Sequence, residues 1–302
     1  MSRVVRFERW GGPDVLRVVE VPARRPGPAE VQVTVRASGV TAGESAAREG
    51  ALAELYPRAF PAATGSEFAG VVTDVGSRAR RFAVGDEVLG WSPEQGGHAD
   101  VVVVPEGALV RKPAAVSWEV AGALYVAGVT AWTCVESTGV GDGDVVLVVG
   151  AASDVGTLVV QLARLCGAGV VGVAEATHHD WLHAHGADAV EPADAGALAR
   201  VVHGRAGRVD VVVDTTGADV DHLAEALGVP ASRCVATLPL EADLEFGPAA
   251  PRRAEVLAEL VDLVAQDRLH VPIAGAFALD DVVEAFATAE RPHRRGRIVL
   301  LP

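Results

Sequence analysis

Residues 145–156 constrain the fold of this chain more than any other segment. Val145 to Val149 read as a buried strand, and Gly150 and Gly156 then take the first and last glycine positions of a G-x-x-G-x-x-G turn. The residues that follow have the apolar spacing of a helix. A strand, a tight turn and a helix in this order bring free backbone N–H groups and the positive end of a helix dipole together, where a pyrophosphate binds. The segment predicts a nucleotide site, and the alternative is a buried strand with an ordinary turn that uses two glycines.

The middle glycine position of this turn is altered. Ser153 stands there, and Asp154 and Val155 follow it. In one interpretation Ser153 or Asp154 caps the following helix by accepting a hydrogen bond from an N–H group that would otherwise have no partner. In the other, the Asp154 carboxylate repels a pyrophosphate, so that the protein binds its nucleotide weakly or not at all.

Three further apolar runs extend the pattern. Residues 169–174 form a β-like run that ends at Glu175. This acid lies about 20 residues beyond the turn, where a carboxylate reads the ribose hydroxyls of a dinucleotide. A third run over residues 209–213 leads into Asp214-Thr-Thr-Gly217, and a fourth covers residues 234–238. Strands that alternate with helix-patterned segments predict a parallel sheet.

The first third of the chain has a different character. Between residues 4 and 104, short alternating apolar runs are separated by Gly, Pro and Asp turns, which is typical of a β-rich, barrel-like unit. Near residue 118 the apolar period changes. From residue 271 a short strand, a helix over 279–289 and a strand over 297–301 form a tail that can return to the first domain. We expect a β-rich domain of residues 1–118 and 268–302, and an α/β domain of residues 119–267, since 302 residues suffice for two domains.

Charge and composition limit the partners. The net charge of −14 disfavours nucleic acid and anionic membranes, because no basic run is longer than a pair such as Arg294-Arg295. No apolar stretch reaches the length of about 18 to 20 residues that a membrane span needs, and the N-terminus lacks the apolar region of a signal peptide. We therefore expect a soluble, cytoplasmic protein.

The cysteines and histidines give no pattern of metal ligands. Cys134, Cys166 and Cys234 are far apart in apolar surroundings, so we expect buried free thiols. No C-x-x-C pair is present, which argues against a structural zinc site. His179 and His183 can share a helix face, but no third ligand has a matching spacing, and a solvated surface is the favoured interpretation.

Six short motifs, taken together and in order, are similar to those of a known family. They are Gly12-Pro-Asp-Val-Leu16, Pro26-Gly-Pro-Ala-Glu30, Gly65-Ser-Glu-Phe-Ala-Gly70, Val84-Gly-Asp-Glu-Val88, Gly128-Val-Thr-Ala-Trp132 and Arg295-Gly-Arg-Ile-Val299. With the domain order, they resemble the zinc-independent medium-chain dehydrogenase/reductase superfamily, in its quinone oxidoreductase (zeta-crystallin-like) branch. The resemblance implies a GroES-like catalytic domain, a Rossmann doubly wound parallel sheet, a cleft between the two and a homodimer.

The departures from the family pattern concern two places in the first domain. Zinc-dependent members carry a Cys and a His ligand where this chain has Thr41 and Ser66, and neither side chain replaces a thiolate or an imidazole. We therefore predict no zinc at Thr41, Ser66 or Glu67. The quinone reductase branch commonly has an Asn and an Asp around the first place, whereas this chain has Thr41-Ala-Gly-Glu44, which loses the amide and keeps an acid.

The activity that the resemblance implies is hydride transfer from a reduced nicotinamide to a quinone or an activated, enone-type double bond. The protein then needs hydrogen-bond donors for the developing oxygen anion but no nucleophile. The catalytic candidates are Thr41, Ser45 and Tyr125; in the alternative, the hydroxyls cap turns and Tyr125 packs in the core. The cofactor candidates are Thr130, Gly150, Ser153, Asp154, Val155, Gly156, Glu175, Thr216, Gly217 and Arg297.

Two questions stay open at this level. Glu175 favours NADH over NADPH, because a carboxylate and a 2′-phosphate about 4 Å apart repel by about 4 kcal/mol at a dielectric constant near 20. In the alternative, Glu175 turns outward and His178 or His179 receives the phosphate. The second question is activity: the altered turn and the missing amide are also compatible with a repurposed scaffold, either a ligand-binding protein or a non-redox tailoring enzyme.

Overall fold

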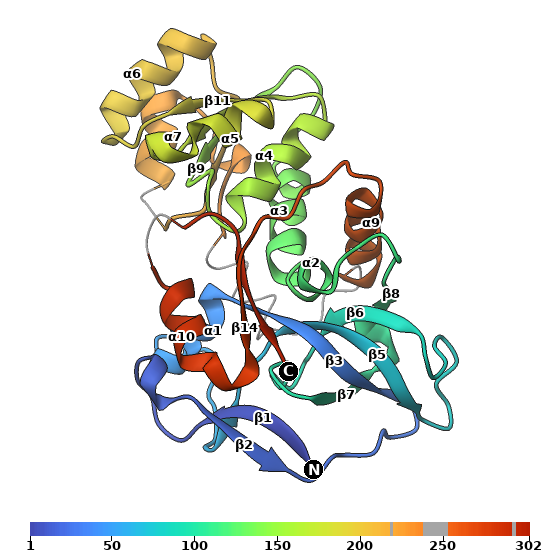
Figure 1. Ribbon diagram of the computed structural model, residues 1–302. Helices are drawn as coiled ribbons and strands as arrows, with labels where there is room; N and C mark the ends of the chain where they lie inside the picture. Colours follow the sequence, from blue (N-terminus) through green and yellow to red (C-terminus); the bar gives the residue numbers. More distant parts are fainter. Residues whose placement is uncertain (218–219, 238–252, 292–293) are drawn as a thin grey trace. The chain divides into compact units, whose positions relative to one another are not determined.

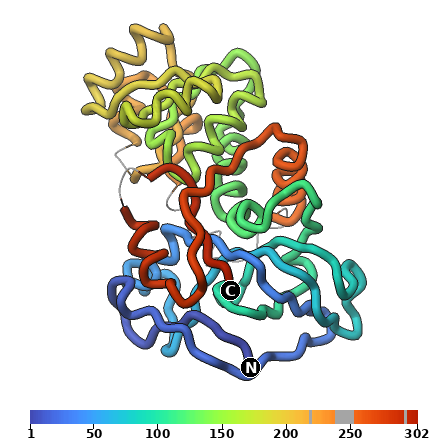
Figure 2. The backbone as a smooth tube through the Cα atoms, in the orientation of Figure 1, coloured from blue at the N-terminus to red at the C-terminus, as the bar shows by residue number. Residues whose placement is uncertain are grey.

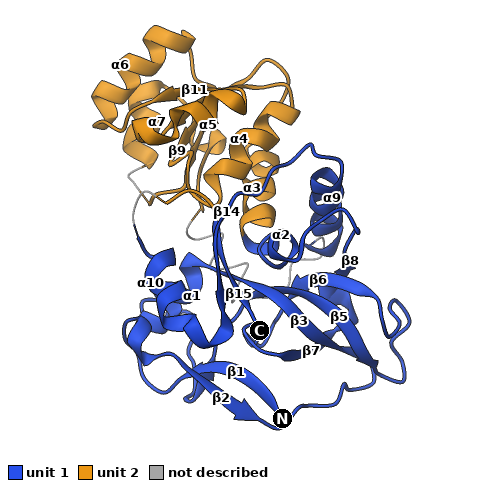
Figure 3. Ribbon diagram, viewed as in Figure 1, with its two compact units in different colours: residues 1–126, 242–292, 297–302 blue, residues 127–241, 293–296 orange. Residues whose placement is uncertain are grey.

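The computed structural model describes residues 1–217, 220–237, 253–291 and 294–302, and the chain divides into two compact units (Figure 3). Unit 1 holds Met1–Val126, Ala242–Pro292 and Arg297–Pro302, and unit 2 holds Ala127–Glu241 and His293–Gly296. Figures 1 and 2 trace the chain through both units.

Unit 1 is built mainly of strands. They are β1 (Ser2–Phe7), β2 (Arg17–Val21), β3 (Glu30–Val40), β4 (Ala62–Ala63), β5 (Glu67–Val75), β6 (Glu87–Trp91), β7 (Val101–Pro105), β8 (Leu109–Arg111), β14 (Ile273–Ala278) and β15 (Arg297–Leu301). The larger sheet has the order β14-β15-β3-β5-β6-β8, with β7 also paired to β3, and the smaller has the order β2-β1-β4. Only the β14–β15 pair is parallel among these described pairings. The long β3, whose side chains alternate between buried and half-buried along most of its length, organises the larger sheet.

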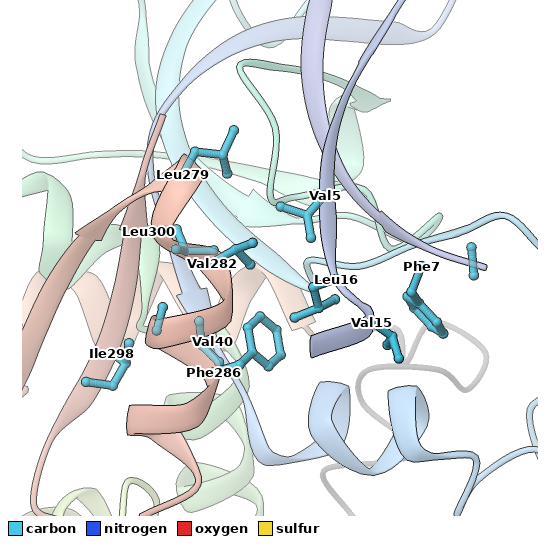
Figure 4. Close-up of a cluster of buried hydrophobic side chains, with 12 residues drawn as sticks. Val5, Phe7, Val15, Leu16, Val40, Leu279, Val282, Phe286, Ile298 and Leu300 are labelled. Carbon is cyan, nitrogen blue, oxygen red and sulfur yellow. The ribbon is translucent and has the colours of Figure 1, made fainter. Parts of the chain in front are cut away.

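The tail of the chain completes unit 1. β15 pairs antiparallel with the end of β3, where Ile298 faces Val40, so the expected return of the tail to the first domain is confirmed. The helices of this unit are α1 (Ala42–Glu49), α2 (Trp118–Gly122), α9 (Arg253–Ala265) and α10 (Val282–Ala289). Figure 4 shows α10 and β15 contributing to one apolar cluster with the first strands of the chain. Phe286 of α10 is fully buried in it, together with Phe7 and Leu16.

Unit 2 is a parallel sheet with helices. Its elements are α3 (Tyr125–Ser137, whose first two residues belong to unit 1), β9 (Val145–Val149), α4 (Gly156–Leu165), β10 (Gly169–Val173), α5 (His179–Ala184), β11 (Ala187–Val190), α6 (Ala195–Ala206), β12 (Val211–Asp214), α7 (Val220–Leu227) and β13 (Cys234–Ala236). The strand order is β11-β10-β9-β12-β13, and all four pairings are parallel. This is the Rossmann order around β9, where the winding reverses, so the predicted fold class is confirmed. Of the predicted fourth strand, residue 238 lies outside the described residues.

The apolar strands explain why this sheet forms. The centre of β9, Val146 to Val148, has no exposed surface, as expected for a strand covered on both faces. One face is closed by apolar residues of α6 and α7, such as Leu198 and Leu223, which pack in one cluster with Leu147. Among the helices that the structure describes, none is long and apolar enough to cross a membrane.

The unit boundaries differ from the boundaries expected at residues 118 and 268. α2 packs on β3 and β5, and α9 packs on β8, so both helices belong to unit 1. The change of apolar period near residue 118 correctly marks the first helices of the chain's middle part. A helical period does not tell which sheet the helix covers, however, because that depends on packing between residues far apart in the sequence.

The expectation of three buried cysteines was wrong for two of them. All three are free, but only Cys134 is buried; Cys234 is half-buried and Cys166 is exposed. Cys166 follows the last turn of α4, where the chain leaves the core, so its apolar neighbours in the sequence do not cover it.

Candidate functional site

A cavity of about 430 Å³ lies in unit 2 at the carboxyl ends of β9 and β10. Gly150, Ser153, Glu175 and Thr216 are among its lining residues. β9 has β10 on one side and β12 on the other, so the cavity lies at the point where the strand order reverses. Dinucleotides bind at such a point in doubly wound sheets. A larger cavity of about 620 Å³ in unit 1 is lined by none of the predicted site residues.

The turn between β9 and α4 requires its two glycines. Gly150 has a φ of +75°, which a side chain rarely allows. Gly156 lies so close to the other side of the turn that a Cβ there would collide with the Gly150 carbonyl oxygen. The turn is therefore tight, and it leads directly into the first residue of α4.

Ser153, at the middle position of the turn, forms hydrogen bonds to both ends of the turn region. Its Oγ accepts from the Gly156 N–H at 2.9 Å and lies 2.8 Å from the Thr215 Oγ1. Thr215 Oγ1 in turn lies 3.0 Å from the Gly150 carbonyl oxygen, to which it can donate. Ser153 thus provides an acceptor for the first N–H of α4 from within the turn, although the residue directly before the helix is Val155, which makes no side-chain cap. Val155, another predicted cofactor residue, is buried at the same helix start.

Asp154 forms an ion pair that the sequence analysis missed. Its two carboxylate oxygens accept from Nη1 and Nη2 of Arg294, both at 3.1 Å. The two side chains are 18% and 17% exposed, respectively, and Arg294 lines the cavity. The carboxylate therefore does not act on a bound anion as an isolated charge. The only signal in the sequence was the basic pair that ends with Arg295, which by itself reads as surface.

The remaining cofactor candidates of unit 2 lie at the ends of strands or in α3. Glu175 follows β10 and precedes a 3₁₀ turn over Ala176–His178. The N–H and Oγ1 of Thr216 both donate to the carboxylate of Asp214, at 2.9 and 2.7 Å, and Gly217 has a φ of +77°. Thr130 in α3 is fully buried, and its Oγ1 has no hydrogen-bond partner among the described residues. A buried hydroxyl without a partner costs free energy, which a ligand can recover.

A second cluster of polar residues is buried in unit 1. Thr41 and Glu44 form a capping box at the start of α1, in which the Glu44 N–H donates to Thr41 Oγ1. The Glu44 carboxylate also lies 2.9 Å from His98 Nε2 and accepts from the Ser66 N–H at 2.6 Å. His98 Nδ1 lies 2.8 Å from Ser38 Oγ. All of these side chains are almost fully buried.

The charge of this cluster is set by opposing effects. Burial alone would raise the pKa of Glu44, but the charge of His98 and the hydrogen bonds from His98 and Ser66 outweigh it and lower that pKa. The sequence analysis kept Glu44 as an acid of the family type and missed His98. The histidine stands just before β7, after two glycines, and no spacing rule connects it to residue 44.

Both catalytic candidates of α1 have internal partners. Thr41 caps the helix, as the alternative interpretation had it. Ser45 donates its hydroxyl to Glu290 Oε1 at 2.8 Å, and Arg48 Nη1 donates to the same oxygen at 2.8 Å. A role for either hydroxyl at a substrate stays a prediction that would require an exchange of partners.

Tyr125 packs in the core of unit 1. Its ring stacks on Trp91 with centroids 4.8 Å apart and planes inclined by 11°. The phenol oxygen accepts from Arg253 Nη1 at 3.3 Å, and the side chain is almost fully buried. This arrangement supports the packing interpretation, and proton donation by the phenol stays a prediction.

Arg297 has a partner other than a cofactor within unit 1. Its guanidinium pairs with Glu67, which also accepts from the Val126 N–H at 2.8 Å. Burial raises the pKa of Glu67, with a contribution from the charge of Glu44, in spite of Arg297 and Val126. The placement of Arg297 at the cofactor therefore remains a prediction without a contact to support it.

The residues at the zinc positions of the family do not fit a zinc ion. Thr41 caps α1, Ser66 Oγ donates to Gln95 at 2.9 Å, and Glu67 is neutralised by Arg297. Within the described ranges, no group of three or more His, Cys, Asp or Glu side chains is arranged to hold a metal ion. The donors present are hydroxyls and one paired acid, whereas zinc prefers thiolate and imidazole.

Comparison with known proteins agrees with this architecture. Residues 27–114 match the family "Alcohol dehydrogenase GroES-like domain", and residues 185–300 match the family "Zinc-binding dehydrogenase". The quinone oxidoreductase of Pseudomonas aeruginosa is 32% identical over 224 residues, which cover 72% of this chain and 68% of that protein. Quinone oxidoreductase 1 of Escherichia coli is 31% identical over 57% of this chain and 52% of its own length.

Solved structures extend the likeness to the whole chain. The quinone oxidoreductase of Pseudomonas syringae pv. tomato superposes with a TM-score of 0.84 at 28% identity and covers 100% of both chains. A mycobacterial protein solved in complex with NADPH has a TM-score of 0.83 at 28% identity and also covers 100% of both chains. The chain belongs to the quinone oxidoreductase branch of the medium-chain dehydrogenase/reductase superfamily, a branch of NAD(P)H-dependent oxidoreductases.

Proposed function

We propose that this protein uses NAD(P)H to reduce a quinone or an activated, enone-type double bond. The observation that carries the proposal is the cavity at the reversal point of the parallel sheet, lined by the glycine turn and by Glu175. When bound there, a reduced nicotinamide supplies a hydride to an electron-poor carbon. The names of the quinone oxidoreductases that this chain is similar to support the substrate class.

The residues present fit such a cofactor. The backbone of the turn from Gly150 to Gly156, with the start of α4, offers N–H groups to a diphosphate. Glu175, which follows β10, can accept hydrogen bonds from ribose hydroxyls. Thr216 and Gly217 follow the end of β12, on the other side of β9. Thr130 offers a buried hydroxyl that has no partner among the described residues.

The protein's catalytic task is to align the reactants, exclude water and donate hydrogen bonds to an oxygen that becomes anionic. We assign the donor role to Thr41 and Ser45, although each has an internal partner. We assign Thr130, whose hydroxyl makes no bond within the described residues, to the nicotinamide. Thr130→Val keeps the shape and removes the hydroxyl, and we expect it to lower kcat by about tenfold or more.

We further propose that NADH binds more tightly than NADPH, because Glu175 lines the cavity. Repulsion of a 2′-phosphate, reduced by solvent to about 1 to 3 kcal/mol, corresponds to a preference of about 5- to 150-fold. His178 lines the same cavity and is the competing partner for that phosphate. The test is to measure the dissociation constants of NADH and NADPH for the wild type and for Glu175→Gly. If the two nucleotides bind the wild type equally well and the substitution changes neither constant, Glu175 is not part of the cofactor site.

One experiment separates a reductase from a repurposed scaffold. At about 100 times its dissociation constant, a nucleotide that binds the folded state stabilises it by about 2.7 kcal/mol, so a thermal shift with NADH or NADPH detects binding. A turnover screen of quinones, enones and enoyl thioesters then identifies the substrate class. No shift with either nucleotide would favour the scaffold. The Asp154–Arg294 pair weakens the original reason for that alternative, which was an unopposed charge in the turn.

The likeness to the family also supports a homodimer and a cytoplasmic location, both of which we propose. Light scattering after size-exclusion chromatography checks the first, and fractionation of cells checks the second.

A further inference from the structure

The ion pair between Asp154 and Arg294 places a cation at the edge of the proposed diphosphate site. The two guanidinium nitrogens that bind Asp154 leave a third, Nε, which is buried and has no hydrogen-bond partner in the described part of the chain. Arg294 lines the cavity together with Gly150 and Ser153. A guanidinium can bind a carboxylate and a phosphate at once, because its donors point in several directions in one plane.

The neighbouring residue holds this segment in place. Arg295 Nη1 lies 3.4 Å from Nδ1 of His178, and its guanidinium lies 5.5 Å from the centre of the Trp181 ring. Both partners come from the region between β10 and the end of α5. Two consecutive arginines are thus attached to unit 2 at separate points, which limits how far Arg294 can move from the turn.

The Asp154–Arg294 ion pair reduces the repulsion between Asp154 and a bound diphosphate. Asp154 follows Ser153 in the glycine turn, and its charge near a diphosphate would oppose binding. At an effective dielectric constant near 20, two like charges a few ångströms apart repel strongly enough to weaken binding by about 100-fold. One arginine in contact with Asp154 cancels most of this repulsion and leaves a donor for the anion.

We propose that Arg294 binds the diphosphate of the nicotinamide cofactor, and that Asp154 is the positioning residue that holds Arg294 at the turn. This inference rests on the proposed function, since it names a further residue of the same site. The diphosphate is common to NADH and NADPH, so Arg294 contributes to the affinity of both. A contact with the 2′-phosphate would instead affect NADPH alone.

The test measures dissociation constants of NADH and NADPH by fluorescence titration of the full chain. Arg294→Gln is expected to weaken both nucleotides by about 10- to 100-fold, because it removes a contact and exposes the anion to Asp154. Asp154→Asn with Arg294→Gln is expected to recover part of that loss, since the repulsion is gone. Arg294→Lys, which keeps the charge but not the planar contact, is expected to lose less than Arg294→Gln.

Arg208→Gln is the matched control. Arg208 also pairs with an aspartate of unit 2, Asp210 at 3.0 Å, but its side chain is 64% exposed and it does not line the cavity. This variant should bind both nucleotides as the wild type does. Circular dichroism of each variant verifies that it is folded, and Arg294→Lys keeps the test open if Arg294→Gln unfolds.

The outcomes distinguish a failure of the proposed function from a failure of the inference about Arg294. Wild-type protein that binds neither nucleotide refutes the proposed function and this inference together. The inference alone is overturned if the wild type binds both nucleotides and Arg294→Gln leaves their dissociation constants unchanged. It is also overturned if Arg294→Gln weakens the binding of NADPH only. The inference is supported if Arg294→Gln weakens the affinity for both nucleotides equally and the additional Asp154→Asn substitution recovers part of that affinity.

Discussion

Gly156→Ala tests whether the turn between β9 and α4 is as tight as the structure shows. A Cβ at this position would collide with the Gly150 carbonyl oxygen and lie 3.0 Å from the Ala151 Cα. Both obstacles are backbone atoms, so no side-chain rotation relieves the overlap, and the turn itself must move. Overpacking of this kind costs about 1 to 3 kcal/mol.

A glycine elsewhere in unit 2 provides the comparison. Gly204 lies within α6, and a Cβ there meets no atom within 4 Å. Gly204→Ala should therefore stabilise the protein by about 0.5 to 1 kcal/mol, which is the usual gain from replacing glycine within a helix. The two variants make the same chemical change and should differ in unfolding free energy by about 1.5 to 4 kcal/mol.

The assay combines urea unfolding, followed by circular dichroism, with nucleotide titration. Because movement of the turn also displaces the N–H groups offered to a diphosphate, Gly156→Ala should weaken nucleotide binding, by tenfold for each 1.4 kcal/mol lost. Gly204→Ala should bind normally. If Gly156→Ala were as stable as Gly204→Ala and bound nucleotide normally, the close packing of the turn and its role in binding would both be wrong.

Four further predictions concern the rest of the chain. Glu44→Gln should destabilise the fold by about 2 to 4 kcal/mol near neutral pH. Because the folded-state pKa of Glu44 is lowered, its contribution is fully present above the unfolded pKa and is lost as pH falls through the folded value, so the stabilities of wild type and variant should begin to converge as pH falls below about 4.3. Phe286→Ala should cost about 3 to 5 kcal/mol in urea unfolding, whereas Val283→Ala, on the exposed side of the same helix, should change stability by less than about 0.5 kcal/mol. A thiol reagent should label Cys166 before Cys134, because Cys166 is exposed and Cys134 is buried. The rate should rise with pH as the thiolate forms, and partial desolvation, which raises the pKa of Cys166, should move that rise to higher pH; faster labelling of Cys134 would contradict the structure. Elemental analysis after dialysis against a weak chelator should find far less than one zinc ion per chain, and stoichiometric zinc would contradict the assignment of the donor set.

Most of the parallel sheet was predictable because four of its five described strands coincide with short apolar runs, whereas β11 (Ala187–Val190), which is interrupted by Asp188, was missed. The run at β9 and the two glycines of its turn fix a strand, a close approach and a helix within a few residues. The position of Glu175 follows from the same local order. Local patterns of this kind need no knowledge of distant residues, which is why sequence reasoning found them.

The ion pairs were not predictable, because their partners are far apart in the chain. Asp154 and Arg294 are brought together only by the return of the tail, and Glu44 meets His98 only when α1 packs near the start of β7. For the same reason the sequence did not show that α9 packs on β8 of unit 1. Composition shows that such charges exist, but only tertiary packing decides which of them meet.

The pairing of β15 with β3 has a consequence for the order in which the protein is made. Half of the apolar cluster around Phe7 and Leu16 comes from residues beyond 278, and β15 leaves the ribosome after every other strand that the structure describes. At about 5 to 20 residues per second, those early side chains wait for roughly 15 to 50 seconds before their partners exist. Residues 127–241, which form most of unit 2, are contiguous and complete by then. During synthesis the nascent chain therefore carries the residues of its parallel sheet beside an unfinished core, and unit 1 can close only after β15 has emerged from the ribosome.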